Sequence, residues 1–215
     1  MIKNFTTKHA TYTEEQFIEH VNKDASVIIE AGSRDLLDAL YLEQYFPKAN
    51  IYSFECNEDS WSICENNLTK SEGRIHLSKC ALYNKNENIS FYAFEHDKTE
   101  EHDIGVSSIY KHNNPASVPQ KNVTVKGIRL DTFCEQNAIK YIDYLCLDVQ
   151  GAEKVVLEGL GDFLNKVGFL VLEDDAFQYQ QCESVGIDLL KNFEQITSIC
   201  HDTLYRRTPS LKKIS

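Results

Sequence analysis

The stretch SVIIEAGSRD, which spans residues 26–35, decides which fold the chain adopts. A short apolar run such as residues 26–31 is typical of a strand that is buried on both faces of a parallel sheet. Gly32 lets the backbone turn sharply at the end of that strand and lets a ligand approach the main chain closely. Residues 36–46 then show helical periodicity, which ends before Pro47. This region therefore predicts a strand, a tight turn and a helix.

The alternation of apolar strand and helical segment continues on both sides of this stretch. Further strands are expected at residues 50–55, 74–78, 88–94, 123–125, 144–149, 169–173, 196–199 and 203–206. Further helices are expected at residues 14–21, 59–68, 130–137, 152–160 and 184–193. Such alternation is typical of an α/β fold with a mostly parallel sheet covered by helices. Because 215 residues suffice for one domain with a proper core, we expect residues 1–215 to form a single domain.

A polar segment, residues 95–122, interrupts this pattern. It contains three histidines and two prolines, and a loop of this length in a compact domain is usually functional or disordered. We expect it to be a lid or substrate loop in which Ser107 and Ser108 contact the substrate. Metal binding by its histidines is an alternative to a solvated polar loop.

The composition argues against several classes of partner. The formal net charge is −11, whereas binding to a nucleic-acid backbone needs a basic face. No apolar run approaches the roughly 18 residues that cross a membrane, and the first residues show no signal-peptide pattern. The seven cysteines include no C-x-x-C pair, which favours reduced thiols and argues against a zinc site. We therefore expect a soluble, cytoplasmic protein that binds neither nucleic acid nor membrane.

Acidic residues end several of the expected strands, at positions where a parallel sheet binds its ligands. Glu55 ends the second strand, and a carboxylate at that place can accept hydrogen bonds from both hydroxyls of a ribose. Together with the bend at Gly32, it indicates a ligand that contains a nucleoside. The alternative is that Gly32 only forms a turn and that Glu55 pairs with a surface base. Because the chain lacks the G-x-G-x-x-G pattern that pyrophosphate needs, a nicotinamide-dependent oxidoreductase is a weaker interpretation than an S-adenosylmethionine enzyme.

Four blocks of the chain, in this order, resemble the FkbM family of methyltransferases. They are IIEAGSRD at residues 28–35, IYSFECN at 51–57, KCAL at 79–82 and YLCLDVQGAE at 144–153. The resemblance implies a class I methyltransferase, an α/β Rossmann-like fold. In this fold a seven-stranded, mostly parallel sheet has helices on both faces and an antiparallel last strand. The resemblance also implies S-adenosylmethionine as cofactor and O-methylation of a hydroxyl group on a sugar, a glycan or a small metabolite.

The resemblance further implies roles for individual residues. Those matched to cofactor-binding positions are Glu30, Gly32, Ser33, Glu55, Cys56, Cys80 and Ala81. Glu55 is the implied ribose ligand, and Cys80 and Ala81 are expected beside the adenine. Two positions depart from the family, because Leu36 stands where a glycine is common and Gln150 replaces a usual glutamate. These departures leave open an alternative, a catalytically inactive scaffold or sensor of the same fold that still binds the cofactor.

Methyl transfer to an aliphatic hydroxyl needs a base that takes the hydroxyl proton as the new bond forms. We expect Asp148, near the end of the strand at residues 144–149, to be this base. One alternative is that Asp148 only contacts the amino group of the cofactor. Another is that Asp148, Glu173 and Asp174 are oxygen ligands of Mg²⁺, which would bind the acceptor oxygen and lower its pKa.

Overall fold

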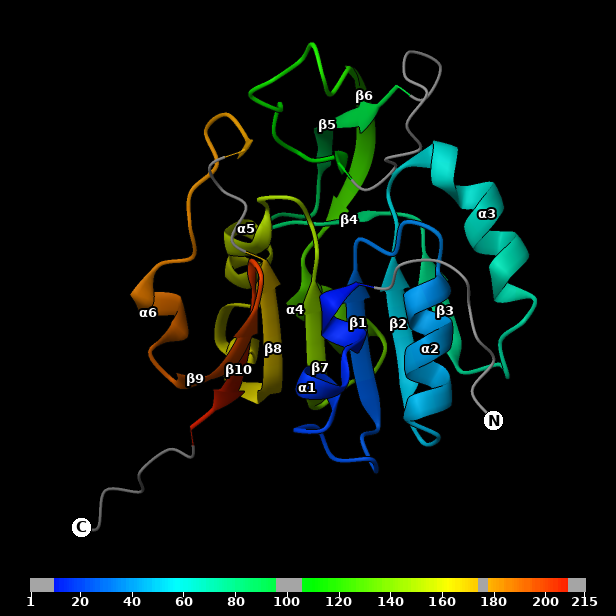
Figure 1. The fold of residues 1–215 in the computed structure, drawn as a ribbon, viewed down its shortest axis with the longest axis vertical. Helices are drawn as coiled ribbons and strands as arrows, with labels where there is room; N and C mark the ends of the chain where they lie inside the picture. The colour runs from blue at the N-terminus through cyan, green and yellow to red at the C-terminus, as the bar shows by residue number, and fades with distance from the viewer. Residues whose placement is uncertain (1–9, 96–105, 174–177, 209–215) are drawn as a thin grey trace.

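The computed structural model describes residues 10–95, 106–173 and 178–208, which form two sheets and the helices around them (Figure 1). The larger sheet has seven strands in the order β3-β2-β1-β7-β8-β10-β9. Their bounds are β1 Val27–Ala31, β2 Asn50–Phe54, β3 Ile75–Ser78, β7 Ile142–Leu147, β8 Val167–Glu173, β9 Phe193–Ile199 and β10 Asp202–Arg207. Neighbouring strands pair in parallel except at β10, which is antiparallel to both β8 and β9. The expected seven-stranded, mostly parallel sheet is therefore confirmed.

The apolar run that begins this sheet forms β1 because its side chains are buried on both faces. Ile28 and Ile29 are fully buried, and they pack into opposite core clusters. Tyr144 and Leu145 repeat this arrangement on the neighbouring strand β7. A strand that alternates between two cores has no polar face, which explains the continuous apolar run in the sequence.

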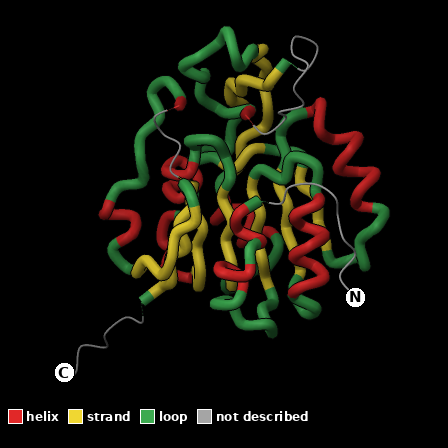
Figure 2. The backbone as a smooth tube through the Cα atoms, viewed as in Figure 1, coloured by secondary structure: helices red, strands yellow, loops and turns green. Residues whose placement is uncertain are grey.

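Helices cover both faces of the large sheet, as Figure 2 shows and as the sequence predicted. The first core cluster contains side chains of α1 Glu15–Ile18, α2 Leu37–Tyr45 and α3 Glu58–Leu68. The second contains side chains of α4 Leu130–Gln136 and α5 Glu153–Glu158, and α6 Ile187–Leu190 packs against it. Within the described ranges, no helix combines the length and the apolar composition that crossing a bilayer requires.

A smaller sheet lies beyond the carboxyl ends of β1, β2 and β7, at the top of Figure 1. It contains β4 Ala81–Leu82, β5 Asn88–Phe94 and β6 Gln120–Ile128, in the order β4-β6-β5. Because Gln120 already pairs with Phe94, the irregular segment expected at residues 95–122 ends at residue 119. Polar side chains along β6 conceal the start of this strand in the sequence. Residues 96–105 of the same segment lie outside the described residues.

The C-terminal part differs most from the sequence prediction. Only Ile187–Leu190 is helical within the helix expected at residues 184–193, and β9 begins at Phe193 rather than at residue 196. Phe193 pairs with Arg207 of β10. The start of β9 therefore depends on its partner strand, which a local apolar pattern does not report.

Candidate active site

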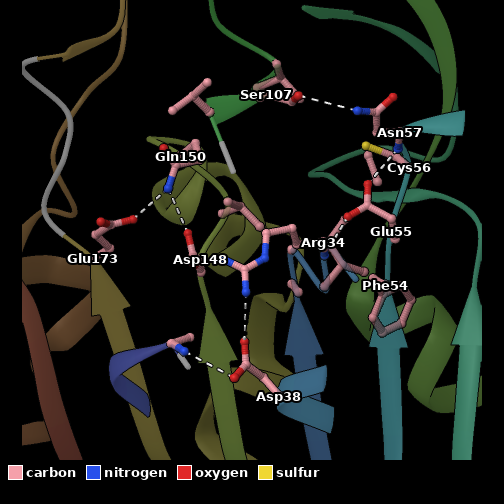
Figure 3. Close-up of a pocket in the computed structure, with 18 of the residues that line it drawn as sticks. Arg34, Asp38, Phe54, Glu55, Cys56, Asn57, Ser107, Asp148, Gln150 and Glu173 are labelled. Atoms are coloured by element: carbon pink, nitrogen blue, oxygen red, sulfur yellow. Dashed lines mark hydrogen bonds and ion pairs between the residues drawn. The ribbon is translucent and has the colours of Figure 1, made fainter. Parts of the chain in front are cut away.

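A cavity of about 410 Å³ opens at the carboxyl ends of the large sheet (Figure 3). This volume lies within the range of small-molecule sites. The turns that follow β1, β2 and β7 form one part of its lining, and β4 and β5 of the small sheet form another. The segment 10–12 and residues 106, 107 and 109 also contribute. The cavity therefore lies where an open parallel sheet binds its ligands.

Gly32 forms the sharp bend that the sequence predicted after β1. Its φ angle is 90°, and a Cβ atom on this residue would lie 1.8 Å from the main-chain oxygen of Asp148. The amides of Gly32 and Ser33 both donate to the carbonyl oxygen of Phe54, at 3.1 Å. Only glycine permits this close contact together with a positive φ angle. The bend thereby packs the turn after β1 against the ends of β2 and β7.

Glu55 follows β2 and lines the cavity beside this bend. Its Oε2 accepts a hydrogen bond from the amide of Arg34 at 2.8 Å, and its Oε1 accepts one from the amide of Asn57 at 2.7 Å. A carboxylate has about four acceptor sites, so the side chain is held in place and still has capacity for ligand hydroxyls. Burial raises the pKa of Glu55 to about 7, although the amide donors lower it. The structure thus brings Gly32 and Glu55 to one cavity, and ribose binding by Glu55 stays a prediction.

Three other residues expected beside a cofactor, Cys56, Cys80 and Ala81, also line the cavity. With Leu82 and Phe91, they form an apolar wall toward the small sheet. Burial raises the pKa of the Cys80 thiol to about 11, so this group is neutral at pH 7. A wall of this kind suits the flat face of an aromatic ring.

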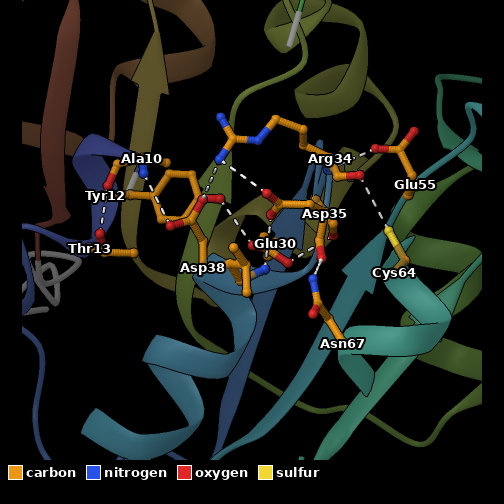
Figure 4. Close-up of polar contacts among 12 residues, drawn as sticks. Ala10, Tyr12, Thr13, Glu30, Arg34, Asp35, Asp38, Glu55, Cys64 and Asn67 are labelled. Carbon is orange, nitrogen blue, oxygen red and sulfur yellow. Dashed lines mark hydrogen bonds and ion pairs between the residues drawn. The ribbon is translucent and has the colours of Figure 1, made fainter. Parts of the chain in front are cut away.

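Glu30 and Ser33, also expected to bind the cofactor, are buried and are not among the described residues that line the cavity. Figure 4 shows Glu30 beside Tyr12. Glu30 is fully buried, and its Oε1 accepts a hydrogen bond from the hydroxyl of Tyr12 at 3.0 Å. The hydroxyl of Ser33 donates to Glu30 Oε2 at 2.8 Å. Burial first, and then the charge of Asp38, raise the pKa of Glu30 to about 7. These side chains are engaged with one another, and they tie the bend after β1 to the N-terminal segment.

The burial of Glu30 predicts that the stability of the protein falls as the pH rises. The pKa of Glu30 is about 7 in the folded protein and 4.5 for the ordinary side chain, so between these values the folded state keeps a proton that the unfolded state releases. The free energy of unfolding should therefore fall by about 2 kcal/mol between pH 5 and pH 7 through this residue alone. Glu30→Gln, which resembles the protonated form, should remove that part of the slope in urea unfolding.

Other buried carboxyls such as Glu55 contribute to the same slope, so the measured quantity is the difference between variant and wild type. Glu194→Gln, at an exposed position of β9, is the matched control and should leave the slope unchanged. If the free energy of unfolding of Glu30→Gln falls with pH as steeply as that of the wild type, Glu30 is not the source of this part of the slope.

Asp148 follows β7 and lines the cavity, where Gln150 holds its side chain. The amide Nε2 of Gln150 donates to Asp148 Oδ1 at 2.7 Å and to Glu173 Oε2 at 2.9 Å (Figure 3). The hydroxyl of Tyr179 donates to Gln150 Oε1 at 2.7 Å, which turns the NH₂ group toward both carboxylates. Burial raises the pKa of Asp148, and the hydrogen bond from Gln150 opposes this effect. The unusual glutamine of the sequence therefore bridges two acids at the cavity.

This bridge bears on the magnesium ligands that the sequence suggested. Asp148 and Glu173 both line the cavity, but the amide of Gln150 donates to an oxygen of each, and Asp174 is outside the described residues. Among the residues that the structure describes, no three acidic, histidine or cysteine side chains are grouped as a metal site. His112, the one histidine of the polar segment with a described position, contacts Tyr179 edge to face.

The two serines expected to contact substrate have different positions. Ser107 lines the cavity, and its hydroxyl accepts a hydrogen bond from the amide of Phe94 at 3.0 Å. Ser108 is buried and donates to the carbonyl oxygen of Gln150 at 2.7 Å. Ser108 therefore holds the polar segment against the turn after β7, and Ser107 faces the ligand space.

The sequence analysis did not predict several of the residues that line the cavity. Ala10 and Tyr12 line the cavity because the N-terminal segment lies over the sheet, where the amide of Ala10 donates to Asp38 Oδ1 at 3.1 Å. The hydroxyl of Tyr144 donates to the carbonyl oxygen of Tyr12 at 2.8 Å. Arg34 and Asp38 also line the cavity. The sequence could have indicated them, because both are charged residues that follow Gly32 closely.

The chain is similar to several known methyltransferases. It is 29% identical over 206 residues to the 2-O-methyltransferase NoeI of Sinorhizobium fredii, covering 90% of this chain and 84% of that protein. It is 26% identical over 126 residues to the hexuronic acid methyltransferase AglP of Haloferax volcanii, covering 59% of this chain and 47% of that protein. A solved structure of a putative rRNA methylase from Clostridium thermocellum aligns with a TM-score of 0.48 and 9% identity, over 95% of this chain and 99% of that one.

The family model described as the methyltransferase FkbM domain matches residues 29–206, which is most of the chain. The match begins within β1 and ends within β10, so it includes every strand of the large sheet. It confirms the expected family and the expected methyltransferase activity, and it supports S-adenosylmethionine as the methyl donor. The fold, the cavity and this match lead to one conclusion: the chain belongs to the FkbM family of methyltransferases.

Proposed function

We propose that this methyltransferase transfers the methyl group of S-adenosylmethionine to a hydroxyl group of a sugar. The observation that carries the proposal is that Gly32, Glu55 and Asp148 line one cavity, in which a nucleoside site and a base would both face the ligand. The relatives support the acceptor class, because one is named for 2-O-methylation and another for a hexuronic acid, which is a sugar acid.

The residues of the cavity fit this cofactor. The carboxylate of Glu55 would accept the ribose hydroxyls, and the apolar wall that includes Cys80 and Ala81 would cover the adenine. The bend at Gly32 exposes main chain to the ligand without a side chain in the way. The bound cofactor supplies a methyl group that a sulfonium centre already activates.

Asp148 would take the proton of the acceptor hydroxyl. Gln150, fixed by Tyr179, holds the Asp148 carboxylate in one orientation, so the base is positioned before the acceptor binds. Burial raises the pKa of Asp148 above its ordinary value, and a carboxylate with a raised pKa is a stronger proton acceptor. The contribution of the chain is therefore alignment together with one proton transfer.

The acceptor would enter beside Ser107 and Gln178, which line the same cavity as Asp148. Hydroxyl and amide side chains of this kind suit the hydroxyl groups of a sugar. We also infer that the chain is a single domain in which residues 106–119 cover the acceptor. Acidic side chains outnumber basic ones in the described lining, which disfavours a nucleic acid as acceptor.

Two measurements test the proposal. Calorimetry should show binding of S-adenosylhomocysteine, and incubation with methyl-labelled S-adenosylmethionine should label at least one member of a panel of neutral sugars and hexuronic acids. Binding of NAD, with no binding of S-adenosylhomocysteine, would favour the oxidoreductase alternative. Tight binding of S-adenosylhomocysteine without labelling of any acceptor would favour the inactive scaffold.

Gln150→Glu tests whether a third carboxylate beside Asp148 and Glu173 creates a binding site for Mg²⁺. The substitution replaces a bridging amide by a third carboxylate beside Asp148 and Glu173, so repulsion should destabilise the protein by about 1–2 kcal/mol. Magnesium should then raise the unfolding temperature of the variant by a few degrees, because oxygen ligands suit this ion, and should leave the wild type unchanged. Thermal unfolding with MgCl₂ and with EDTA measures both effects. An equal response of wild type and variant would contradict this expectation.

A further inference from the structure

Arg34 is the one basic side chain among the described residues that line the cavity. The acidic side chains of the same lining are Asp38, Glu55, Asp148, Glu173 and Asp202. A ligand that carried a carboxylate would meet repulsion at most of this surface, and attraction only near Arg34. The position of Arg34 therefore decides where such a group can bind.

The main chain holds Arg34 firmly in the bend after β1. Its amide donates to Glu55 Oε2 at 2.8 Å, and its carbonyl oxygen accepts a hydrogen bond from the thiol of Cys64 at 3.4 Å. The φ angle of Arg34 is 52°, in the left-handed region, so Arg34 belongs to the bend and not to the helix α2 that begins at Leu37. Arg34 is thus linked directly to the residue proposed to hold the ribose.

The side chain of Arg34 extends from this bend toward the end of β7 (Figures 3 and 4). Its Nη2 forms ion pairs with Asp35 at 3.6 Å and with Asp38 at 4.0 Å. These distances are those of loose ion pairs rather than of short hydrogen bonds, and a third of the side chain is exposed. A planar guanidinium with five N–H groups can keep such pairs and still receive a carboxylate at another edge.

We propose that Arg34 binds the α-carboxylate of the amino-acid part of the methyl donor. The inference rests on the proposed function and adds a residue to it. Along the sheet, Glu55 follows β2, Arg34 follows β1 and Asp148 follows β7, in the order in which these strands lie side by side. A ligand with its ribose at Glu55 and its reacting end near Asp148 must pass Arg34. The amino-acid part is a zwitterion, so its ammonium group suits the surrounding acids while its carboxylate needs this cation.

An acidic acceptor could offer the same chemistry, since a hexuronic acid also carries a carboxylate. The two sources are separable because 5′-methylthioadenosine has the nucleoside and the sulfur of S-adenosylhomocysteine but lacks the amino-acid part. Calorimetry with both compounds therefore isolates the carboxylate of the cofactor, and no acceptor needs to be known.

Arg34→Met removes the charge and keeps a long, unbranched side chain. It should weaken the binding of S-adenosylhomocysteine by about 10- to 50-fold, because the bidentate, charge-assisted hydrogen bonds between the guanidinium and the carboxylate are lost. The affinity for 5′-methylthioadenosine should change by less than about twofold, which also shows that the variant is folded and keeps its nucleoside site. Arg34→Lys should recover part of the lost affinity, since lysine keeps the charge without the planar fork.

The matched control is Arg206→Met, which removes one positive charge from an exposed ion pair with Glu194 on β10 and β9. It should change neither affinity. Equal losses of both ligands in Arg34→Met would mean that Arg34 only shapes the bend, and this would overturn the proposal. So would unchanged affinity for S-adenosylhomocysteine, including the case in which the variant selectively loses transfer to hexuronic acids. If wild type binds neither compound, the proposed function itself fails.

Discussion

Asp148→Asn should lower the rate of methyl transfer to the acceptor by about 10²–10⁴-fold, while the affinity for S-adenosylhomocysteine changes by no more than about threefold. Asparagine keeps the shape of the side chain and can still contact Gln150, but it cannot take a proton from a hydroxyl group. The loss should therefore appear in the turnover number and not in cofactor binding. Steady-state kinetics with the best sugar of the acceptor panel, together with calorimetry, separate the two quantities.

The pH dependence of the wild-type rate is an independent test of whether Asp148 is the base. Only its ionised form accepts a proton, so the rate should rise as the pH passes the pKa of Asp148 and then level off. Because burial raises this pKa, the rise should occur at a higher pH than an exposed aspartate would produce. In Asp148→Asn this rise should disappear.

Asp188→Asn, at an exposed position of α6, is the matched control for this substitution and should not alter the rate. An equal loss of turnover and cofactor affinity in Asp148→Asn would instead show that Asp148 contacts the amino group of the cofactor. That outcome would remove the base from the proposed mechanism, although the methyl donor would remain.

Glu55→Ala should weaken the binding of S-adenosylhomocysteine by about 100-fold or more. Two hydrogen bonds from ribose hydroxyls to a charged acceptor contribute roughly 1.5 kcal/mol each, and every 1.4 kcal/mol is about tenfold in affinity. The substitution also leaves the amides of Arg34 and Asn57 without their acceptor, which loosens the bend that contacts the ligand. Calorimetry on the wild type, the variant and the exposed-site control Glu194→Ala measures the difference.

The raised pKa of Glu55 adds a pH signature to this experiment. At pH 6 most of the ligand-free protein carries Glu55 protonated, since its pKa is about 7, whereas the ribose hydroxyls need the carboxylate as acceptor. Affinity for S-adenosylhomocysteine should therefore rise by roughly tenfold from pH 6 to pH 8. Glu55→Gln should bind weakly and show no such rise. A variant that binds as tightly as the wild type at pH 8 would exclude Glu55 as the ribose ligand.

The sequence by itself determined the large sheet and the edge of it at which the cavity lies. Strands such as β1 and β7 are buried on both faces, and they leave a continuous apolar run that is visible in any window of the chain. The acid after β2 and the glycine after β1 were likewise placed at one site, because parallel strands end at the same edge. The strands β6 and β9 were predicted too short, since partner strands define their ends.

Only the tertiary structure decided which acids reach the cavity. Glu30 and Glu55 occupy similar places at the ends of neighbouring strands, but Glu30 lies within β1 and turns toward Tyr12, whereas Glu55 lies beyond the last residue of β2. Glu30 pairs with Ser53, so it lies two residues deeper in the sheet than Glu55. An offset of two residues keeps the same face of a strand, so depth within the sheet, and not the face of the strand, separates the two acids. The bridge from Tyr179 through Gln150 to Asp148 was equally hidden, because Tyr179 is far from the other two residues in the chain. A local sequence pattern shows whether a segment is a helix or a strand, because each has its own period. Contacts between distant segments decide which partners the side chains of that segment have.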